Sequence, residues 1–229
     1  MPAKAKKLLL WDFDGTLAYR SGGWAGALAD VLRQSAPEIK ADEDRIRPYL
    51  QSGFPWHAPE NAHPNLSADE WWDELTPLFA RAFRGIGAKN GIELAEKVRA
   101  VYTDPTAWKL HDDVLPALDA LKKQGWTHVL LTNHVPELPA LLKHLGLEKS
   151  FASVFNSAET GYEKPNGHAF RQALDWAGPT EDVWVIGDSF PGDIIGAREA
   201  GLKAVLVRQP SKGAELYCER LDQLATILG

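Results

Sequence analysis

Short apolar runs alternate with amphipathic stretches over most of the chain. Each run has the length of a buried strand and is bounded by turn-forming residues, a pattern typical of parallel sheets. The runs are Leu8–Trp11, Trp126–Thr132, Ser153–Asn156, Val183–Ile186 and Ala204–Val207. Helical patterns that end at glycines separate the later runs; they cover 112–124, Pro136–Leu145, Gly167–Trp176 and Asp193–Ala200. This alternation predicts right-handed βαβ units, and so an α/β fold around a five-stranded parallel sheet.

The segment between the first two runs has a different pattern. No clear strand occurs between residues 20 and 105, and helical patterns cover 24–34 and about 91–102. A further long helix begins after Ser67, which forms a capping-box pattern with Glu70. We therefore predict an all-helical insert at residues 20–107 within an α/β core made of residues 1–19 and 108–229.

Two acidic residues follow the first apolar run directly. Asp12 and Asp14 are separated by Phe13 and precede a Gly15-Thr16 turn. Because side chains alternate along a strand, the two carboxylates can point the same way while Phe13 points into the core. Open α/β sheets bind ligands at this end of their strands. Two adjacent carboxylates repel unless a cation or a proton lies between them, although a solvated acidic turn would have the same sequence.

Three later motifs have polar residues in comparable positions. Thr132-Asn133 ends the second run, Lys164-Pro165 lies in a loop, and GDSFPGD spans Gly187–Asp193. Each also has a purely structural interpretation. Thr132 could satisfy the backbone at a strand end, Lys164 could be a solvated lysine, and the acids of the last motif could favour a helix N-terminus.

Taken together and in order, DFDGT, Thr132-Asn133, Lys164-Pro165 and GDSFPGD resemble the motifs of the haloacid dehalogenase-like (HAD) hydrolase superfamily. The resemblance covers the whole chain and is closest to the helical-cap (C1) branch that includes phosphoglycolate phosphatase-like proteins. It implies a three-layer, Rossmann-like fold with strand order 5-4-1-2-3, and a mobile helical cap between the first and second motifs. The expected hinges are Tyr19–Gly23 and Thr103–Leu110.

The convergence of carboxylates predicts a bound hard cation, and Mg²⁺ is the natural choice because it prefers oxygen ligands. The chain has no His/Cys cluster with the spacing of a transition-metal site. By resemblance, Asp12 and Asp188 supply side-chain oxygens to the magnesium ion, Asp14 supplies its backbone carbonyl, and Asp193 binds the ion itself or a water bound to it.

The resemblance also implies the chemistry. Asp12 is the expected nucleophile that forms an aspartyl-phosphate, and Asp14 is the general acid and base. The phosphoryl group is expected to be held by Thr132, Asn133 and Lys164. In the dehalogenase branch the position of Asp14 is not an acid, because halide leaves without protonation. Asp14 therefore favours a Mg²⁺-dependent phosphatase of a small phosphorylated metabolite.

Substrate contacts are harder to predict. The candidate contacts in the insert are Arg20, Trp24, Trp56, His57 and His63, and His134 is a further candidate beside the second motif. For each histidine, a loop residue bonded to backbone or water is the interpretation that residue type alone favours, and His57 and His63 are the better candidates because they flank a proline-rich loop. No dense arginine cluster occurs in the insert, so the sequence gives no argument for a nucleotide or polyphosphorylated ligand.

Composition excludes several other partners and compartments. The 229-residue chain carries a net charge of -6 and no long basic run, which argues against nucleic acid or an anionic membrane as a partner. The apolar run after the basic N-terminus is too short for a signal peptide or a spanning helix. The one cysteine, Cys218, rules out an internal disulfide and is typical of the cytoplasm. The sequence leaves monomer and homodimer open.

Other functions remain possible on the same motifs. A phosphomutase would need a cap that excludes water while the phosphorylated intermediate persists, and a 2-haloacid dehalogenase would need halide release despite Asp14. A non-enzymatic regulatory or binding module that retains the HAD fold is the alternative from a different class.

Overall fold

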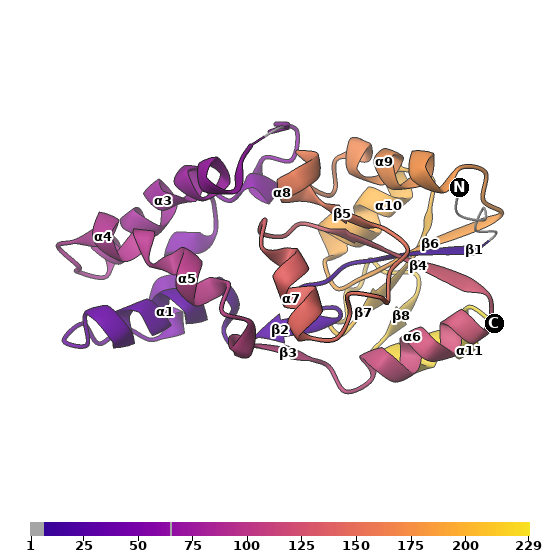
Figure 1. Cartoon of the computed structure of the whole chain (residues 1–229), viewed down its shortest axis with the longest axis horizontal. Coiled ribbons are helices and arrows are strands. Elements are labelled where there is room, and N and C mark those ends of the chain that lie inside the picture. The colour runs from indigo at the N-terminus through magenta and orange to yellow at the C-terminus, as the bar shows by residue number, and fades with distance from the viewer. Residues whose placement is uncertain (1–6, 65) are drawn as a thin grey trace.

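The computed structural model describes residues 7–64 and 66–229, and its centre is a parallel sheet (Figure 1). The strand order is β5-β4-β1-β6-β7-β8, and every pair of neighbours is parallel. The strands are β1 Lys7–Trp11, β4 Trp126–Thr132, β5 Val154–Asn156, β6 Asp182–Gly187, β7 Lys203–Val207 and β8 Tyr217–Cys218. The five predicted strands and their order are confirmed, and β8 is a sixth strand at the edge.

The register of the sheet determines which strand ends lie side by side. Trp11, the last residue of β1, pairs with Leu130 of β4 and with Ile186 of β6. The residues that follow β1 are therefore flanked by the carboxyl ends of both neighbouring strands. This arrangement brings Asp12 close to Thr132 and to the loop that begins at Asp188.

Helices cover both faces of the sheet, which confirms the three layers. Figure 1 shows α9 and α10 on one face, and α6 and α11 on the other. Alternate residues of β1 enter two different apolar clusters, so Leu8 and Leu10 pack on one face while Leu9 and Trp11 pack on the other. The helices of this region are α6 Val114–Lys123, α7 Leu138–His144, α8 Ser157–Thr160, α9 Gly167–Ala177, α10 Gly196–Glu199 and α11 Leu224–Ile227.

One predicted helix has a different form. The sequence predicts a helix over Asp193–Ala200, whereas the structure has a π-helical turn at Phe190–Ile195 followed by the short α10. The turn begins after Ser189, whose hydroxyl accepts a hydrogen bond from the Gly192 N–H. Asp193 is buried within the turn and faces the sheet edge.

The inserted segment is helical, and its helices extend away from the sheet (Figure 1). Ser67 caps the longest helix and forms the predicted capping box with Glu70. The predicted helix at 91–102 is divided in two near Lys97. The helices are α1 Gly23–Ser35, α2 Glu43–Ile46, α3 Ala68–Gly85, α4 Gly91–Glu96 and α5 Val98–Tyr102, with 3-10 turns at Arg47–Leu50 and Pro55–His57.

The two connections to the insert are paired rather than irregular. β2 (Ala18–Arg20) and β3 (Trp108–Leu110) form an antiparallel two-stranded sheet. The predicted hinge segments at 19–23 and 103–110 therefore include backbone pairing that the sequence pattern did not reveal. In the part of the chain that the structure describes, no helix is both long and apolar enough to cross a membrane.

Candidate active site

Three carboxylates meet at the carboxyl edge of the sheet. Asp12 follows β1, Asp188 follows β6, and Asp193 comes from the π-helical turn. One oxygen from each of the three lies within 4.8 Å of the others. Asp12 and Asp193 are buried, and Asp188 is partly exposed. The structure thus brings together the side chains of three of the four predicted metal ligands. The fourth, Asp14, was predicted to bind through its backbone carbonyl.

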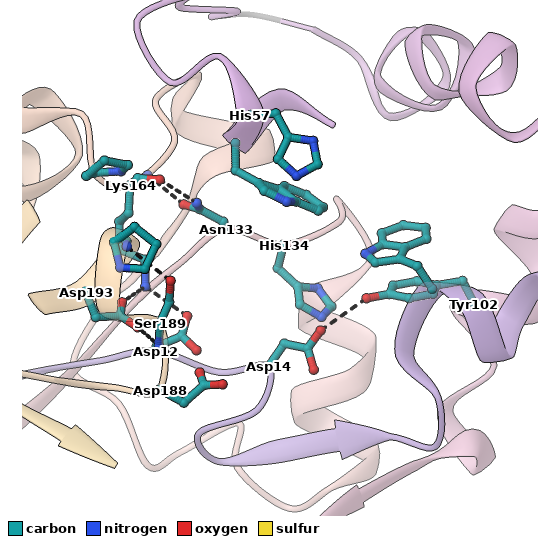
Figure 2. A pocket seen from close by; sticks show the side chains of 15 residues that line it. Asp12, Asp14, His57, Tyr102, Asn133, His134, Lys164, Asp188, Ser189 and Asp193 are labelled. Carbon is teal, nitrogen blue, oxygen red and sulfur yellow. Dashed lines mark hydrogen bonds and ion pairs between the residues drawn. The ribbon is translucent and has the colours of Figure 1, made fainter. Parts of the chain in front are cut away.

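Lys164 lies in the middle of this acidic group (Figure 2). Its Nζ donates to Asp12 Oδ1 at 2.8 Å and to Asp193 Oδ1 at 2.6 Å. The side chain is 3% exposed. Burial alone would lower the pKa of Lys164, but the charges of Asp12 and Asp193 raise it well above its usual value. The lysine is therefore held as a buried cation between two carboxylates.

The backbone of Lys164 is fixed by Asn133. The Asn133 amide donates to the Lys164 carbonyl at 2.9 Å, and its oxygen accepts from the Lys164 N–H at 2.7 Å. Asn133 follows β4, so this pair of hydrogen bonds ties the lysine loop to the sheet. Thr132, the last residue of β4, donates its hydroxyl to Asp12 Oδ1 at 3.0 Å. The sequence-predicted phosphate-binding residues therefore all lie around Asp12.

The acidic group carries more negative charge than the lysine balances. Burial, with the charges of Asp12, Asp193 and Asp14, raises the pKa of Asp188 to about 8. Burial also raises the pKa of Asp193 to about 6, against the effect of Lys164. Carboxylates with raised pKa values are stabilised by a nearby cation. The three carboxylate oxygens, and the negative charge that Lys164 leaves unbalanced, fit a hard divalent cation, which prefers oxygen ligands.

Two glycines allow the carboxylates to approach the backbone. A Cβ atom on Gly187 would lie 2.1 Å from Asp193 Cγ, and one on Gly15 would lie 2.3 Å from Asp188 Oδ2. Gly15 also has a φ of +86°, a conformation that residues with a side chain rarely adopt. Next to it, the Thr16 hydroxyl donates to Asp188 Oδ1 at 3.1 Å. The DFDGT turn thus positions a carboxylate from another strand.

Asp14 lies on the side of the site nearest the insert, where Tyr102 donates its hydroxyl to Asp14 Oδ2 at 3.4 Å (Figure 2). Burial, assisted by the charge of Asp12, raises the pKa of Asp14 to about 7. A carboxyl group with a pKa near neutrality can both donate and accept a proton at physiological pH. Asp14 therefore has the properties of a general acid and base.

A cavity of about 410 Å³ lies between the sheet edge and the insert. The acids and Lys164 line one side, while Trp24, Trp56 and His57 come from the insert. His134 also lines the cavity; it is buried, and burial lowers its pKa to about 4, so its ring is neutral. Of the weaker sequence candidates, His57 and His134 thus lie at the cavity.

The other two weak candidates lie outside the cavity lining. Arg20 is buried and forms an ion pair with Asp30 of α1, so its guanidinium links β2 to the insert. The His63 Nε2 lies 3.2 Å from Glu163 Oε1. The sequence placed both residues near a substrate, but their local partners engage them elsewhere.

The sequence interpretation assigned no role to three residues that contact or adjoin the site. Tyr102 reaches Asp14 from the end of α5, Thr16 holds Asp188, and the fully buried Glu163 precedes Lys164. Thr16 belongs to the DFDGT motif, so its position was visible. Tyr102 and Glu163 act through contacts with residues distant in sequence, for which a single sequence gives no signal.

The parallel sheet with acidic side chains at its carboxyl edge is typical of α/β proteins that bind a ligand at the ends of their strands. A family model for haloacid dehalogenase-like hydrolases matches residues 6–201. The chain therefore belongs to the haloacid dehalogenase-like hydrolase family, and it is a hydrolase.

Individual relatives cover nearly the whole chain. Phosphoserine phosphatase from Thermus thermophilus is 31% identical over 88% of this chain and 88% of its own length. Glyceraldehyde 3-phosphate phosphatase from Methanopyrus kandleri is 30% identical over 89% of this chain and 84% of its own. The structure of the HAD-hydrolase YfnB from Bacillus subtilis bound to magnesium superimposes with a TM-score of 0.73 at 22% identity, covering 99% of this chain and 100% of that one. This last likeness shows the fold.

Proposed function

We propose that the protein is a Mg²⁺-dependent phosphatase that hydrolyses a small phosphate monoester through an aspartyl-phosphate on Asp12. The observation that carries the proposal is the arrangement around Asp12. A buried lysine and Thr132 both donate to one of its oxygens, and two further carboxylates lie beside it. Relatives named as phosphatases support the same reaction class.

In the first step, the free oxygen of Asp12 attacks phosphorus and the bond from phosphorus to the ester oxygen breaks. The departing alkoxide takes the proton of Asp14, so the products are a neutral alcohol and the phosphorylated Asp12. The raised pKa of Asp14, about 7, supports its role as the acid because a useful fraction is protonated at neutral pH.

In the second step, Asp14 is a carboxylate and accepts a proton from water. The water oxygen attacks phosphorus, the bond to the Asp12 oxygen breaks, and inorganic phosphate leaves with Asp12 restored. Covalent catalysis of this kind divides one difficult displacement into two easier ones.

Asp12, Asp188 and Asp193 would hold Mg²⁺ through their side chains, with Asp14 contributing its backbone carbonyl as predicted from the sequence. When bound, the ion neutralises negative charge on the phosphoryl oxygens and on the surrounding carboxylates. Lys164, Thr132 and Asn133 would hold the phosphoryl group on the other side. Lys164 is well placed because its charge is already directed at Asp12.

We propose further that residues 20–107 act as a cap domain on a core made of residues 1–19 and 108–229. The insert carries Tyr102 to Asp14 and closes one side of the cavity. A cap that excludes bulk water strengthens the electrostatic interactions within the site.

The test is phosphate release from a panel of phosphorylated metabolites, measured with Mg²⁺ and after removal of metal by EDTA. The proposal predicts release that disappears with EDTA and returns when Mg²⁺ is added in excess. Undiminished release in EDTA would refute the metal dependence, and no release from any ester would refute the phosphatase assignment.

A further inference from the structure

The side of the cavity that receives the alcohol part of an ester differs from the side that receives phosphate. Among the described residues that line the cavity, Lys164 is the one lysine or arginine, and its Nζ is already engaged by Asp12 and Asp193. Arg20, a cation of the insert close to this region, is paired with Asp30 instead. Among the described residues, no lysine or arginine on this side of the cavity is therefore free to bind a second negative group.

A substrate carboxylate would also find no positive partner among the acids of the cavity. Asp14 and Asp188 line the same cavity, and neither forms an ion pair in the described structure. A second anionic group there would lose its hydration without a compensating cation. The electrostatics disfavour phosphate esters whose alcohol carries a carboxylate.

Aromatic rings form the wall that faces the acids. Trp24 and Trp56 both line the cavity and are partly exposed there. Each is stacked on a buried ring. Trp24 stacks on Tyr102 with centroids 3.6 Å apart and planes 8° apart, and Trp56 stacks on Phe54 at 4.5 Å and 8°. Supported rings of this kind offer fixed, flat, apolar surfaces on which another ring can pack.

The wall also contains a polar group without a partner. His134 is 3% exposed, lines the cavity and has no hydrogen-bond partner on either ring nitrogen. Because the ring is neutral, it offers one N–H donor and one acceptor. An uncharged hydroxyl or ring heteroatom of a ligand would satisfy it, whereas a carboxylate could use the donor alone.

Contacts between the insert and the sheet region hold this wall in place. The backbone N–H of His63 donates to the Gly161 carbonyl at 2.9 Å, and the side-chain amide of Asn166 donates to the Pro59 carbonyl at 2.8 Å. Both contacts join the loop that carries Trp56 to the loop that carries Lys164. The wall therefore lies over the acids in a defined position.

We infer that the alcohol part of the substrate is uncharged and contains a planar ring, which packs against Trp24 and Trp56. The inference rests on the proposed phosphatase function and specifies its substrate class. A cavity of about 410 Å³ accommodates a single ring or a nucleoside, so both kinds of neutral ring-bearing alcohol are included. Small anionic esters such as phosphoserine are excluded as preferred substrates.

The first experiment compares kcat/KM for matched phosphate esters in the presence of Mg²⁺. The esters are benzyl phosphate, 4-carboxybenzyl phosphate, cyclohexylmethyl phosphate, a nucleoside 5′-monophosphate and phosphoserine. We expect benzyl phosphate to exceed its carboxylated form, and phosphoserine, by about tenfold or more. A ratio near one, or a preference for the carboxylated esters, would overturn the inference. Equal rates for the benzyl and cyclohexylmethyl esters would overturn the ring contact, and the nucleotide distinguishes a single ring from a nucleoside.

Acetyl phosphate separates the inference from the function on which it rests, because it has neither a ring nor a further charge. Hydrolysis of acetyl phosphate without the expected ester preference would overturn the inference and leave the phosphatase assignment intact. Failure to hydrolyse acetyl phosphate and every ester would overturn both.

Variants test the residues directly. Trp56→Ala should lower kcat/KM for benzyl phosphate by about tenfold and bring the ratio of the benzyl to the cyclohexylmethyl ester close to one. Trp176→Ala, which removes an exposed tryptophan outside the cavity lining, is the matched control. His57→Arg should move the preference toward 4-carboxybenzyl phosphate, and His57→Gln should not. An unchanged preference in both Trp56→Ala and His57→Arg would contradict the inference.

Discussion

The two sides of the cavity differ in the kind of side chain that lines them. At the sheet edge, charged side chains are held by specific partners: Lys164 contacts two carboxylates, Thr132 contacts Asp12, and Thr16 contacts Asp188. On the side of the insert, the lining consists mainly of stacked rings, such as Trp24 on Tyr102 and Trp56 on Phe54. The first side fixes the positions of charges, and the second offers shape and apolar surface.

This difference separates the reaction from the choice of substrate. The acids at the sheet edge come from the segments that follow β1 and β6, and Lys164 comes from the loop between α8 and α9, which Asn133 ties to the end of β4, so the fold itself determines their distances. The rings come from a helical insert between β2 and β3. A change in the rings can therefore alter the alcohol that fits without disturbing the group that attacks phosphorus. Tyr102 is the exception, since it belongs to the insert and contacts Asp14.

The largest effect is expected from Asp12→Asn at the sheet edge. The amide keeps an oxygen that can accept from Thr132 and Lys164, but it cannot attack phosphorus. We expect kcat to fall by about 10³-fold or more while the circular dichroism spectrum is retained. Residual activity above a few per cent, measured by phosphate release, would contradict the nucleophile assignment.

Asp14→Asn should have the next largest effect, because it removes a proton donor but leaves the nucleophile. Loss of a general acid typically costs about 10²-fold or more for an ester with a poor leaving group. The loss should be clearly smaller for 4-nitrophenyl phosphate, whose leaving group departs without protonation. Equal losses for an alkyl ester and the nitrophenyl ester in steady-state assays would argue against this role.

A smaller effect is expected at Glu163, where the insert contacts the loop that carries Lys164. Glu163 is fully buried, precedes Lys164 and pairs with His63 of the insert at 3.2 Å. Glu163→Gln keeps the shape but removes the charge that the His63 ring faces, so kcat/KM should fall by about threefold to tenfold. Glu159→Gln, at an exposed position in α8, is the matched control. Identical kinetics for the two variants would mean that this ion pair does not couple the insert to the lysine loop.

The last prediction concerns the sheet alone and should not alter catalysis at neutral pH. His128 accepts from the Trp11 indole at 2.9 Å and lies 3.0 Å from the Leu118 carbonyl. Burial lowers its pKa to about 4, so the unfolded chain binds a proton more readily than the folded one. The free energy of unfolding should therefore decrease as pH falls from about 6.5 toward 4, by at most about 3 kcal/mol from this residue.

Urea unfolding at several pH values measures that contribution. His128→Gln should reduce the dependence on pH in this window, and His144→Gln, which changes an exposed histidine, should not. If the free energy of unfolding of His128→Gln changes with pH as steeply as that of the wild type, the pH dependence belongs to other groups, of which His134 is the first to examine.

Much of the fold was predictable from local pattern. The apolar runs predicted five of the six strands of the sheet, and the Ser67–Glu70 pair predicted the start of α3 because capping depends on neighbours in sequence. The strand β8 was missed because two residues, Tyr217 and Cys218, are too few to show a period. The pairing of β2 with β3 was missed because it joins segments about 90 residues apart.

The candidate site was also predicted only in part from the sequence. Asp12, Lys164, Asp188 and Asp193 stand in recognisable motifs, and the structure brings them together. Arg20 and His63 were offered as substrate contacts because of their place in the insert, but Asp30 and Glu163 engage them outside the cavity lining. Tyr102 could not be assigned because its role depends on how the insert lies over Asp14. Local motifs thus predict the charged side of the cavity better than the aromatic side.

The most direct test of the central claim is to find where phosphate is attached during turnover. The wild-type protein is mixed with Mg²⁺ and a hydrolysed ester, quenched in acid within milliseconds, digested and analysed by tandem mass spectrometry. The account predicts a phosphorylated peptide that contains residues 8–17, with the phosphate on Asp12, and no such peptide from Asp12→Asn. Rapid phosphate release with an unmodified Asp12 peptide, or with the phosphate on another residue, would contradict it.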